Sequence, residues 1–443
     1  RTEETHQSLE AIFSMKKKFI IPLLILCGVV IVFGFRTISG RDLNAKDKAP
    51  HIRLNTTLNN SLSNIQELAG MDKEIRRYLT KWEMFGASLA IMRNDSLIYA
   101  KGYGWADKDA NDTMNVGHIM RMASVSKLIT AIGIMKLQDD GRLSIKDKVF
   151  GEMGVLKGTA LDSLVKDTSY KHMTIEHLLR HQGGFYRDPL FSSRDVKLQM
   201  RLDHPPAADD FFRLVLSHNL SFTPGTNQKY SNIGYLLLSR IIEIVTKQPY
   251  DTYIKENVLE PAGCFDMHIG GNYYSDKRTN EVRYYTHRGD GQFIPEYNGS
   301  GRIVERSYGG NNIPLLSGAG AWCGSTAELA RLVASIDGKD EIPDILSKEA
   351  IAQMTEYFDK DTYSLGWNET CPEKGWNRTG TLSGTTALIR YFPDGECWIF
   401  ISNTSTWKSN MQAKETDSLF RKCRKLYGKQ LPARNLFEYE ILN

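Results

Sequence analysis

Residues 122–131 read MASVSKLITA and place Ser124 and Lys127 three positions apart, ahead of an apolar run. Positions three apart lie on one face of a helix, so the serine hydroxyl and the lysine amine can meet. If Ser124 begins the helix, the free N–H groups and partial positive charge of the N-terminus favour a developing oxyanion there. The pattern therefore predicts a nucleophilic serine with Lys127 as a base, provided that burial and nearby positive charge lower the lysine pKa.

The same spacing also has an ordinary interpretation. Ser-x-x-Lys occurs again at 14–17 and at 405–408, without accompanying chemistry, and alone it is typical of a serine N-cap followed by a solvent-facing lysine. Two later stretches of sequence favour the catalytic interpretation of Ser124 and Lys127. Residues 230–232 form the only Tyr-x-Asn in the chain, before a strongly apolar helix, and Arg378-Thr379-Gly380 comes just ahead of a pair of apolar segments.

These three motifs, in this order, resemble the serine beta-lactamase and penicillin-binding protein superfamily, whose signature is S-x-x-K, then S-D-N or Y-x-N, then K-T-G or H-x-G. The resemblance is to the class C beta-lactamase-like branch, which includes D,D-peptidases, D-amino-acid amidases and esterases. Further landmarks extend it over about residues 70 to 425: FGASLAI (85–91), YGWAD (103–107), TIEHLLRHQGGF (174–185), FTPGTNQKYSNIGYLLLSRIIE (222–243), GAGAWCGSTAELARL (318–332) and YSLGW (363–367).

Carried over residue by residue, the resemblance implies that Ser124 is the acylated nucleophile, Lys127 its proton partner and Tyr230 the proton shuttle toward the leaving group. Asn232 would hydrogen-bond both Lys127 and the acyl side-chain amide of the substrate. The oxyanion hole would consist of the backbone N–H groups of Ser124 and Thr381. Two cations near Tyr230 would lower its pKa, so that a phenol can accept a proton at neutral pH.

The third motif departs from the family pattern, because Arg378 stands where the branch has Lys or His. A guanidinium does not give up its proton, so a proton-relay role is lost. It can still bind a substrate carboxylate through two parallel hydrogen bonds. We therefore expect Arg378, Thr379, Gly380 and Thr381 to bind substrate together with Asn232.

Other candidate residues receive a structural interpretation. His181, His268 and His287 also begin H-x-G triplets, but none precedes a strand pair near the C-terminus, and His181 is expected to be a satisfied structural histidine. Trp322 and Trp367 fit a cleft lining or the core equally well. We expect neither a metal nor an organic cofactor, since Glu176 and Asp188 form no paired-carboxylate pattern and the cysteines have no metal-ligand spacing. The cysteines are at 27, 264, 323, 371, 397 and 423.

Hydrophobic periodicity predicts an α/β (α+β) fold, and the resemblance implies that this fold is of the beta-lactamase/transpeptidase type. A helix after Asp72 precedes two strands within 87–104, residues 120–260 are mainly helical, and two strands at 385–403 flank a Pro-Asp-Gly turn before a helix at 413–427. Strands at both ends imply a mainly antiparallel sheet flanked by helices, with a helical lobe and the cleft between them.

The N-terminal region predicts export. Three lysines follow Met15, and residues 19–35 are apolar, which favours a retained signal anchor over a cleaved signal. We divide the chain into a non-native upstream segment (1–14), the anchor (15–35), a solvated linker (36–69), the hydrolase domain (70–428) and a tail (429–443). The catalytic domain would face the periplasmic side of a bacterial inner membrane.

Composition and motifs together define the expected function. A formal net charge of +4 over 443 residues gives no indication of a nucleic-acid partner. We expect an exported serine hydrolase that forms an acyl-enzyme with amide, lactam or ester carbonyls of D-amino-acyl peptides or beta-lactam-like compounds. Its partners would be this small-molecule or peptide substrate and the membrane, through residues 19–35. The alternatives are a broad esterase of the same fold and a catalytically impaired penicillin-binding or sensor protein.

Overall fold

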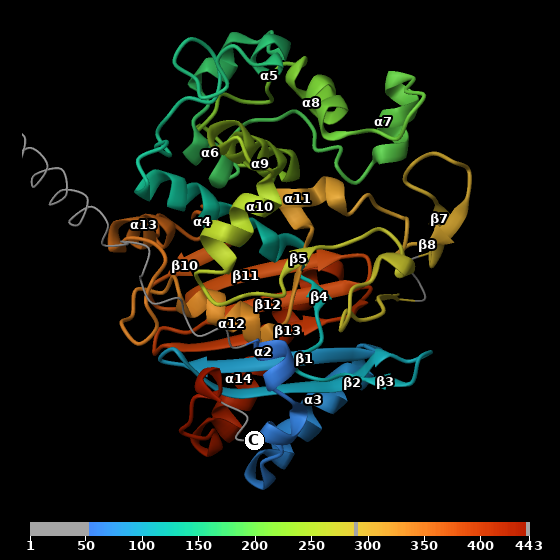
Figure 1. Ribbon diagram of the computed structural model, residues 1–443, viewed down its shortest axis with the longest axis vertical. Helices are drawn as coiled ribbons and strands as arrows, with labels where there is room; N and C mark the ends of the chain where they lie inside the picture. The colour runs from blue at the N-terminus through green and yellow to red at the C-terminus, as the bar shows by residue number, and fades with distance from the viewer. Residues whose placement is uncertain (1–52, 288–290, 440–443) are drawn as a thin grey trace, which may run out of the picture. The chain divides into compact units, whose positions relative to one another are not determined.

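The computed structural model describes residues 53–287 and 291–439 (Figure 1). Its central sheet has the strand order β10-β11-β12-β13-β1-β2-β3, and every neighbouring pair is antiparallel. The strands are β1 (Gly86–Arg93), β2 (Ser96–Asp107), β3 (Asp112–Thr113), β10 (Glu369–Cys371), β11 (Gly375–Leu382), β12 (Thr385–Tyr391) and β13 (Glu396–Ser402). Because β13 pairs with β1, the sheet is built from both ends of the domain, which confirms the prediction.

Two tight turns give the sheet its predicted hairpins. Asn94 and Asp95 have φ of 45° and 58°, and they connect β1 to β2. Turns with two residues at positive φ match the twist of paired strands, and Asn and Asp tolerate that conformation best after glycine. The Pro-Asp-Gly turn between β12 and β13 ends at Gly395, whose φ is 85°.

Both faces of the sheet are covered by helices. In β1, Leu89 and Ile91 pack with α3 (Ala69–Lys81) and α14 (Gln412–Tyr427). The alternate residues Ala90 and Met92 belong to the larger core, which contains α12 (Thr326–Ala334). Side chains alternate between the faces of a strand, so β1 has to be apolar nearly throughout. The predicted helices after residue 72 and at 413–427 are confirmed.

The middle of the chain forms the helical lobe, which lies beyond α4 from the sheet (Figure 1). Helix α4 (Ser126–Asp139) is apolar on all sides and buried over most of its length, because it lies between the sheet and the other helices. The remaining helices are α5 (Ala160–Leu164), α6 (Ile175–Leu179), α7 (Ser193–Met200), α8 (Ala208–Leu216), α9 (Asn232–Thr246), α10 (Tyr250–Ile254), α11 (Ser317–Gly320) and α13 (Lys348–Met354). The predicted fold class is confirmed.

Three small sheets complete the described fold. They have the orders β4-β9-β5, β14-β6 and β7-β8. The strands are β4 (Met120–Arg121), β5 (His268–Ile269), β6 (Tyr285–Thr286), β7 (Phe293–Pro295), β8 (Ile303–Glu305), β9 (Trp322–Gly324) and β14 (Thr404–Ser405). Strand β4 ends three residues before the predicted nucleophile, Ser124.

The predicted linker differs from the structure over its described part. Residues 53–69 contain α2 (Leu54–Thr57) and the 3-10 turns η1 (Asn60–Ser63) and η2 (Gln66–Leu68). Leu54, Leu58 and Leu68 are buried, and the Asn60 side-chain amide donates to the carbonyl of Met114. Large apolar residues are sparse here, but they pack against the domain, with Leu62 and Ile65 partly buried. The predicted tail also packs against the domain in its described part, through Leu431 and Phe437.

The predicted upstream segment and anchor, residues 1–35, lie outside the described residues. In the two described ranges, the model contains no helix with the length and apolar character needed to cross a membrane. The five cysteines within these ranges, from Cys264 to Cys423, are free thiols and are buried.

Candidate active site

Ser124 lies in a strained turn that precedes the central helix. It is half-buried in the 3-10 turn η3 (Ala123–Val125), and the helix α4 begins at Ser126, two residues after the start of the predicted helix. Ala123 has a φ of 49°, which is unusual for a residue with a side chain. The turn is held by Trp322 of β9, whose carbonyl accepts from the Met122 N–H at 2.9 Å and whose N–H donates to Ser126 Oγ at 3.0 Å. Ser124 is thereby fixed at the helix N-terminus.

Lys127 is fully buried beneath the serine. Its Nζ donates to Ser124 Oγ at 3.2 Å, to Asn232 Oδ1 at 2.8 Å and to the Ala319 carbonyl at 2.6 Å. Burial, together with the charge of Arg378, holds the Lys127 pKa below its usual value, although Tyr230 and Asp188 act in the opposite direction. The three acceptors match the three N–H groups of an ammonium.

Tyr230 completes this arrangement from the loop before α9. Its hydroxyl donates to Ser124 Oγ at 2.7 Å, and Lys127 Nζ lies 4.9 Å from the centre of its ring. Burial alone would raise the Tyr230 pKa, but the charges of Lys127 and Arg378 and the hydrogen bonds from Lys127 and Ser124 lower the pKa below the ordinary tyrosine value. The structure therefore brings together the residues of the first two predicted motifs.

The third motif lies on β11, the strand just ahead of the predicted strand pair. The Arg378 side chain, however, does not point toward the substrate as predicted. Arg378 is only 1% exposed, and its Nε and Nη2 donate to the Ser124 carbonyl at 2.8 and 2.6 Å. We expected this guanidinium to face a substrate carboxylate; instead, it binds the main chain of the nucleophile. Gly380 allows the approach, because a Cβ there would lie 2.2 Å from the Met122 carbonyl oxygen.

Thr379 is also engaged within the protein. Its N–H and Oγ1 donate to Asn368 Oδ1 at 2.8 and 3.2 Å. Asn368 lies just before β10, and its own N–H donates to the Asn377 carbonyl at 2.9 Å. Backbone N–H groups on one edge of a strand recur every second residue. The Thr381 N–H therefore points to the same edge of β11 as that of Thr379.

Comparison with known proteins identifies the family. Residues 71–418 match the family model described as Beta-lactamase. The chain belongs to the Beta-lactamase family. Family membership and the geometry around Ser124 make the protein a serine hydrolase.

Individual relatives of the Beta-lactamase family support this assignment. Penicillin-binding protein 4* of Bacillus subtilis (strain 168) is 26% identical over 72% of this chain and 68% of its own length. Protein flp of Staphylococcus aureus (strain N315) is 29% identical over 52% of this chain, which spans only 43% of that relative. The structure of D-amino acid amidase from Ochrobactrum anthropi SV3 with D-phenylalanine superimposes with a TM-score of 0.63 at 18% identity, covering 82% of this chain and 99% of that one. This structural likeness shows the shared fold.

One residue near the Beta-lactamase-family site escaped the sequence reasoning. The Asp188 carboxylate accepts from the N–H of Asn232, in a short contact, and from that of Ile233 at 3.2 Å. It therefore caps the N-terminus of α9, where a negative charge is stabilised, and it raises the Lys127 pKa. Nothing in the local sequence signals this role, because Asp188 and α9 are brought together only by the tertiary fold.

His181 packs behind Tyr230, as expected of a structural histidine. Its Nδ1 accepts from the Ser231 N–H at 3.1 Å, and its ring centre lies 4.3 Å from that of Tyr230. Burial and the charges of Lys127 and Arg378 hold the His181 pKa well below its usual value. A neutral imidazole therefore supports the tyrosine ring.

The two tryptophans belong to the core rather than to a cleft lining. Trp322 and Trp367 are at most 1% exposed. The Trp322 Nε1 donates to the Tyr250 hydroxyl at 3.0 Å. In these two cases, the packing interpretation is correct.

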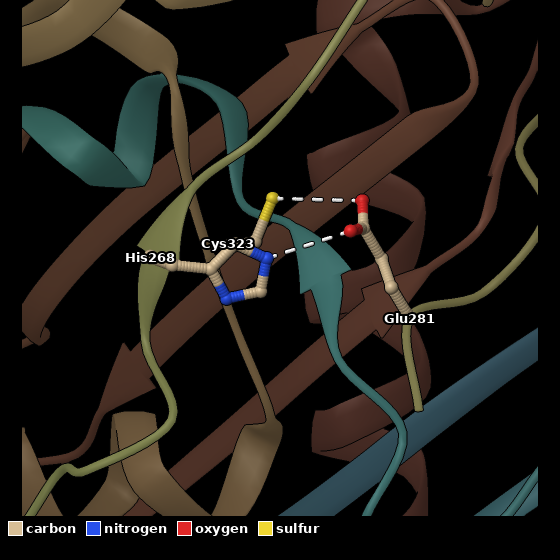
Figure 2. Close-up of side chains that lie close together, drawn as sticks. All are labelled: His268, Glu281 and Cys323. Atoms are coloured by element: carbon tan, nitrogen blue, oxygen red, sulfur yellow. Dashed lines mark hydrogen bonds and ion pairs between the residues drawn. The ribbon is translucent and has the colours of Figure 1, made fainter. Parts of the chain in front are cut away.

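Within the described ranges, one group of three metal-ligand side chains lies together, outside the Ser124 site. Figure 2 shows His268, Glu281 and Cys323 converging from β5, the following loop and β9. Their ligand atoms lie within 4.8 Å of one another, and all three residues are buried. His268 Nε2 is 3.4 Å from Glu281 Oε2, and Cys323 Sγ is 3.9 Å from Glu281 Oε1.

The surroundings of this cluster already hydrogen-bond its carboxylate. The Tyr284 hydroxyl donates to Glu281 Oε1 at 2.8 Å, and the Arg278 N–H donates to Oε2 at 3.2 Å. Burial would raise the pKa of the Glu281 carboxyl, but the hydrogen bond and charge of His268 and the Tyr284 and Arg278 hydrogen bonds lower it. A metal ion would have to displace these partners, and we therefore interpret the cluster as part of the structural core.

Proposed function

We propose that this hydrolase works by two-step acyl transfer, with Ser124 as the nucleophile and Tyr230 as the group that carries its proton. One observation carries the proposal: Ser124 Oγ lies within hydrogen-bond distance of both Tyr230 Oη, at 2.7 Å, and Lys127 Nζ, at 3.2 Å. A nucleophile and its base within such reach are the expected signature of covalent catalysis. Ser124 and Tyr230 are half-buried and reachable, whereas Lys127 is not.

The proton path follows from the hydrogen bonds. Lys127 donates three hydrogen bonds and so acts as an ammonium, which stabilises a phenolate at Tyr230. Once Tyr230 has lost its proton, its hydrogen bond with Ser124 reverses and the Ser124 hydroxyl donates to the phenolate. Ser124 then gives its proton to Tyr230 while Oγ bonds to the substrate carbonyl carbon, and the carbonyl electron pair moves onto oxygen. Tyr230 returns the proton to the leaving group as the tetrahedral intermediate collapses. Water repeats these steps to release the acid and restore Ser124.

Two backbone N–H groups would hold the oxyanion. Ser124 supplies one from the start of the central helix, where the helix dipole favours negative charge. Thr381 supplies the other from β11. The close approach of this strand to the nucleophile turn is supported by the 3.2 Å separation between the Ser124 nitrogen and a Cβ placed on Gly380. Donors of this kind stabilise the transition state by several kcal/mol, about 2.7–4 kcal/mol each.

The proposed substrates are small acyl donors with an amide, lactam or ester carbonyl, including D-amino-acyl derivatives and beta-lactam-like compounds. The names of a penicillin-binding protein and a D-amino acid amidase among similar proteins support this range. Asn232 would bind the acyl side-chain amide with its free amide group, since its Oδ1 accepts from Lys127. We further propose that residues 19–35 anchor the protein and that the catalytic domain acts outside the cytoplasm.

The test uses the full chain with an activated ester and with penicillin G, and follows both product release and intact mass. We expect repeated ester turnover and, with penicillin, a slower acylation that adds the mass of one drug molecule, because penicillin carries a carboxylate beside its scissile bond. Ser124→Ala should remove the adduct and lower the ester rate by at least about 10³-fold. Undiminished hydrolysis by Ser124→Ala would refute the role of the serine. Ester cleavage without a penicillin adduct would favour the broad esterase, and a single stable acylation would favour a penicillin-binding or sensor protein.

A further inference from the structure

We propose that this active site prefers acyl donors whose leaving group is electrically neutral, because the two cations described beside Ser124, Lys127 and Arg378, are both hydrogen-bonded within the protein. This inference rests on the proposed acyl-transfer function and specifies its substrate class. It arises from the third motif, where the sequence predicted a carboxylate-binding Arg378. The side chains of that motif are occupied within the protein itself.

The first observation is that Arg378 is already hydrogen-bonded within the protein. Two of its three guanidinium nitrogens donate to the Ser124 carbonyl at 2.8 and 2.6 Å. The third, Nη1, is buried without a hydrogen-bond partner, so a substrate in the cleft cannot contact it unless the side chain moves. Moving it would leave the carbonyl of the strained nucleophile turn without these donors. Arg378 is therefore a positioning residue for Ser124.

The second observation concerns the next residue of the motif. Both hydrogen-bond donors of Thr379, its N–H and its hydroxyl, are directed to Asn368 Oδ1. A carboxylate at this position would have to compete with an internal acceptor that is already in place. Thr381 is the remaining hydroxyl of the strand, and it is a neutral donor.

The third observation concerns the second cation beside the serine, Lys127. Its ammonium group is fully buried, and its three N–H groups are directed to Ser124 Oγ, Asn232 Oδ1 and the Ala319 carbonyl. A substrate carboxylate would therefore be desolvated without a hydrogen-bonded charged partner from either Lys127 or Arg378. A neutral leaving group avoids this cost.

The experiment compares two matched thioesters of benzoylglycine with the full chain. In one, the leaving thiol carries a carboxylate (thioglycolate); in the other, it carries the corresponding carboxamide. A hydrogen-bonded charge pair would favour the carboxylate by about ten- to a hundredfold in kcat/KM. We expect the neutral thioester to react at least as fast, measured as thiol release at pH 7. A preference of more than about threefold for the carboxylate would overturn the inference.

Failure of the underlying function is distinguishable from failure of this inference. If neither thioester is cleaved, or if Ser124→Ala cleaves both at the original rate, the acyl-transfer proposal fails and the inference falls with it. If both are cleaved by Ser124 and the carboxylate is preferred, the reaction stands and only the inference fails.

Two variants test the structural cause. Arg378→Lys keeps the charge on a side chain that cannot hold the Ser124 carbonyl with two N–H groups, and Asn368→Ala releases the donors of Thr379. Each should raise the carboxylate-to-neutral ratio of kcat/KM, by about two- to fivefold, as a partly exposed charge or donor becomes available. Asn368→Ala retains Arg378 and so remains informative if Arg378→Lys does not fold. An unchanged or lower ratio in the folded variants would contradict the assigned cause.

Discussion

Two groups of titratable side chains lie in this domain, and they differ in what surrounds them. Around Ser124, the serine, Tyr230 and Asn232 are half-buried, so a substrate can reach them. In the second group, His268, Glu281 and Cys323 are all at most 5% exposed. Both groups contain a potential nucleophile and a possible base. Access to solvent separates a candidate site from a buried network.

The electrostatic settings also differ. The charges of Lys127 and Arg378 lower the pKa of Tyr230, which makes proton acceptance by the phenol easier. Burial raises the pKa of the Cys323 thiol well above its usual value, and the Glu281 charge adds to this effect. A thiol that stays protonated is a poor nucleophile and a poor metal ligand. Reactive residue types that lie close together therefore do not form an active site unless nearby charges also activate them.

The largest expected effect is the loss of the proton carrier at Ser124. Tyr230→Phe keeps the ring beside His181 but removes the oxygen 2.7 Å from Ser124 Oγ. We expect kcat for an activated ester to fall by about 10²–10⁴-fold, the usual contribution of a general base. Circular dichroism and the urea midpoint serve as controls for folding. A loss below about threefold would mean that Lys127 carries the proton without Tyr230.

The second group should affect stability instead of activity. Glu281→Gln keeps the side-chain shape but removes the charge that accepts from the Tyr284 hydroxyl and the Arg278 N–H. We expect the free energy of unfolding to fall by about 1–3 kcal/mol, measured by urea titration, with kcat changed less than about twofold. The exposed Glu152→Gln is the matched control and should leave stability unchanged within about 0.5 kcal/mol.

The same titration tests the interpretation of the cluster shown in Figure 2. Because its carboxylate is already hydrogen-bonded to protein groups, EDTA should not move the urea midpoint of the original protein. A fall in the midpoint with EDTA that zinc restores, and that Glu281→Gln abolishes, would identify a metal site and contradict the structural interpretation.

Substitution of Arg378 tests, through the pH dependence of activity, whether nearby positive charge lowers the Tyr230 pKa. Its positive charge lowers the Tyr230 pKa, so Arg378→Gln should raise that pKa. Activity that needs the deprotonated tyrosine rises with pH through this pKa. The acid limb of kcat/KM should therefore move to higher pH, by about one unit. Arg378→Lys retains a charge and should move it less. An acid limb that stays in place in the glutamine variant would show that Tyr230 is not the titrating group.

Much of this arrangement was predictable because it rests on local patterns. The contact between Ser124 and Lys127 follows from their spacing of three, although Ser124 lies in a 3-10 turn before the helix. The strand pair at 385–403 follows from alternation and a Pro-Asp-Gly turn. The orientation of Arg378 was not predictable, because its partner is a carbonyl 254 positions away and Gly380 sets the docking distance between them. Similarly, residues 53–69 are mostly polar and charged, and the burial of Leu54, Leu58 and Leu68 depends on tertiary contacts with the domain.

The smallest expected effect on kcat is that of Asp188. Its substitution tests whether charges near the Ser124 site activate that site. Its charge caps α9 and opposes the lowering of the Lys127 pKa. Asp188→Asn keeps an acceptor but removes the charge, so we expect kcat to fall by about two- to fivefold, in line with the energy of a charge at a helix N-terminus. Asp167→Asn is the matched control, because this aspartate also accepts from two backbone N–H groups, those of Ser169 and Leu220. An equal loss of kcat in both variants would mean that general destabilisation, and not the charge near Lys127, accounts for the effect. A loss confined to Asp188→Asn would extend the charge pattern around Ser124 to a loop residue that does not contact the serine.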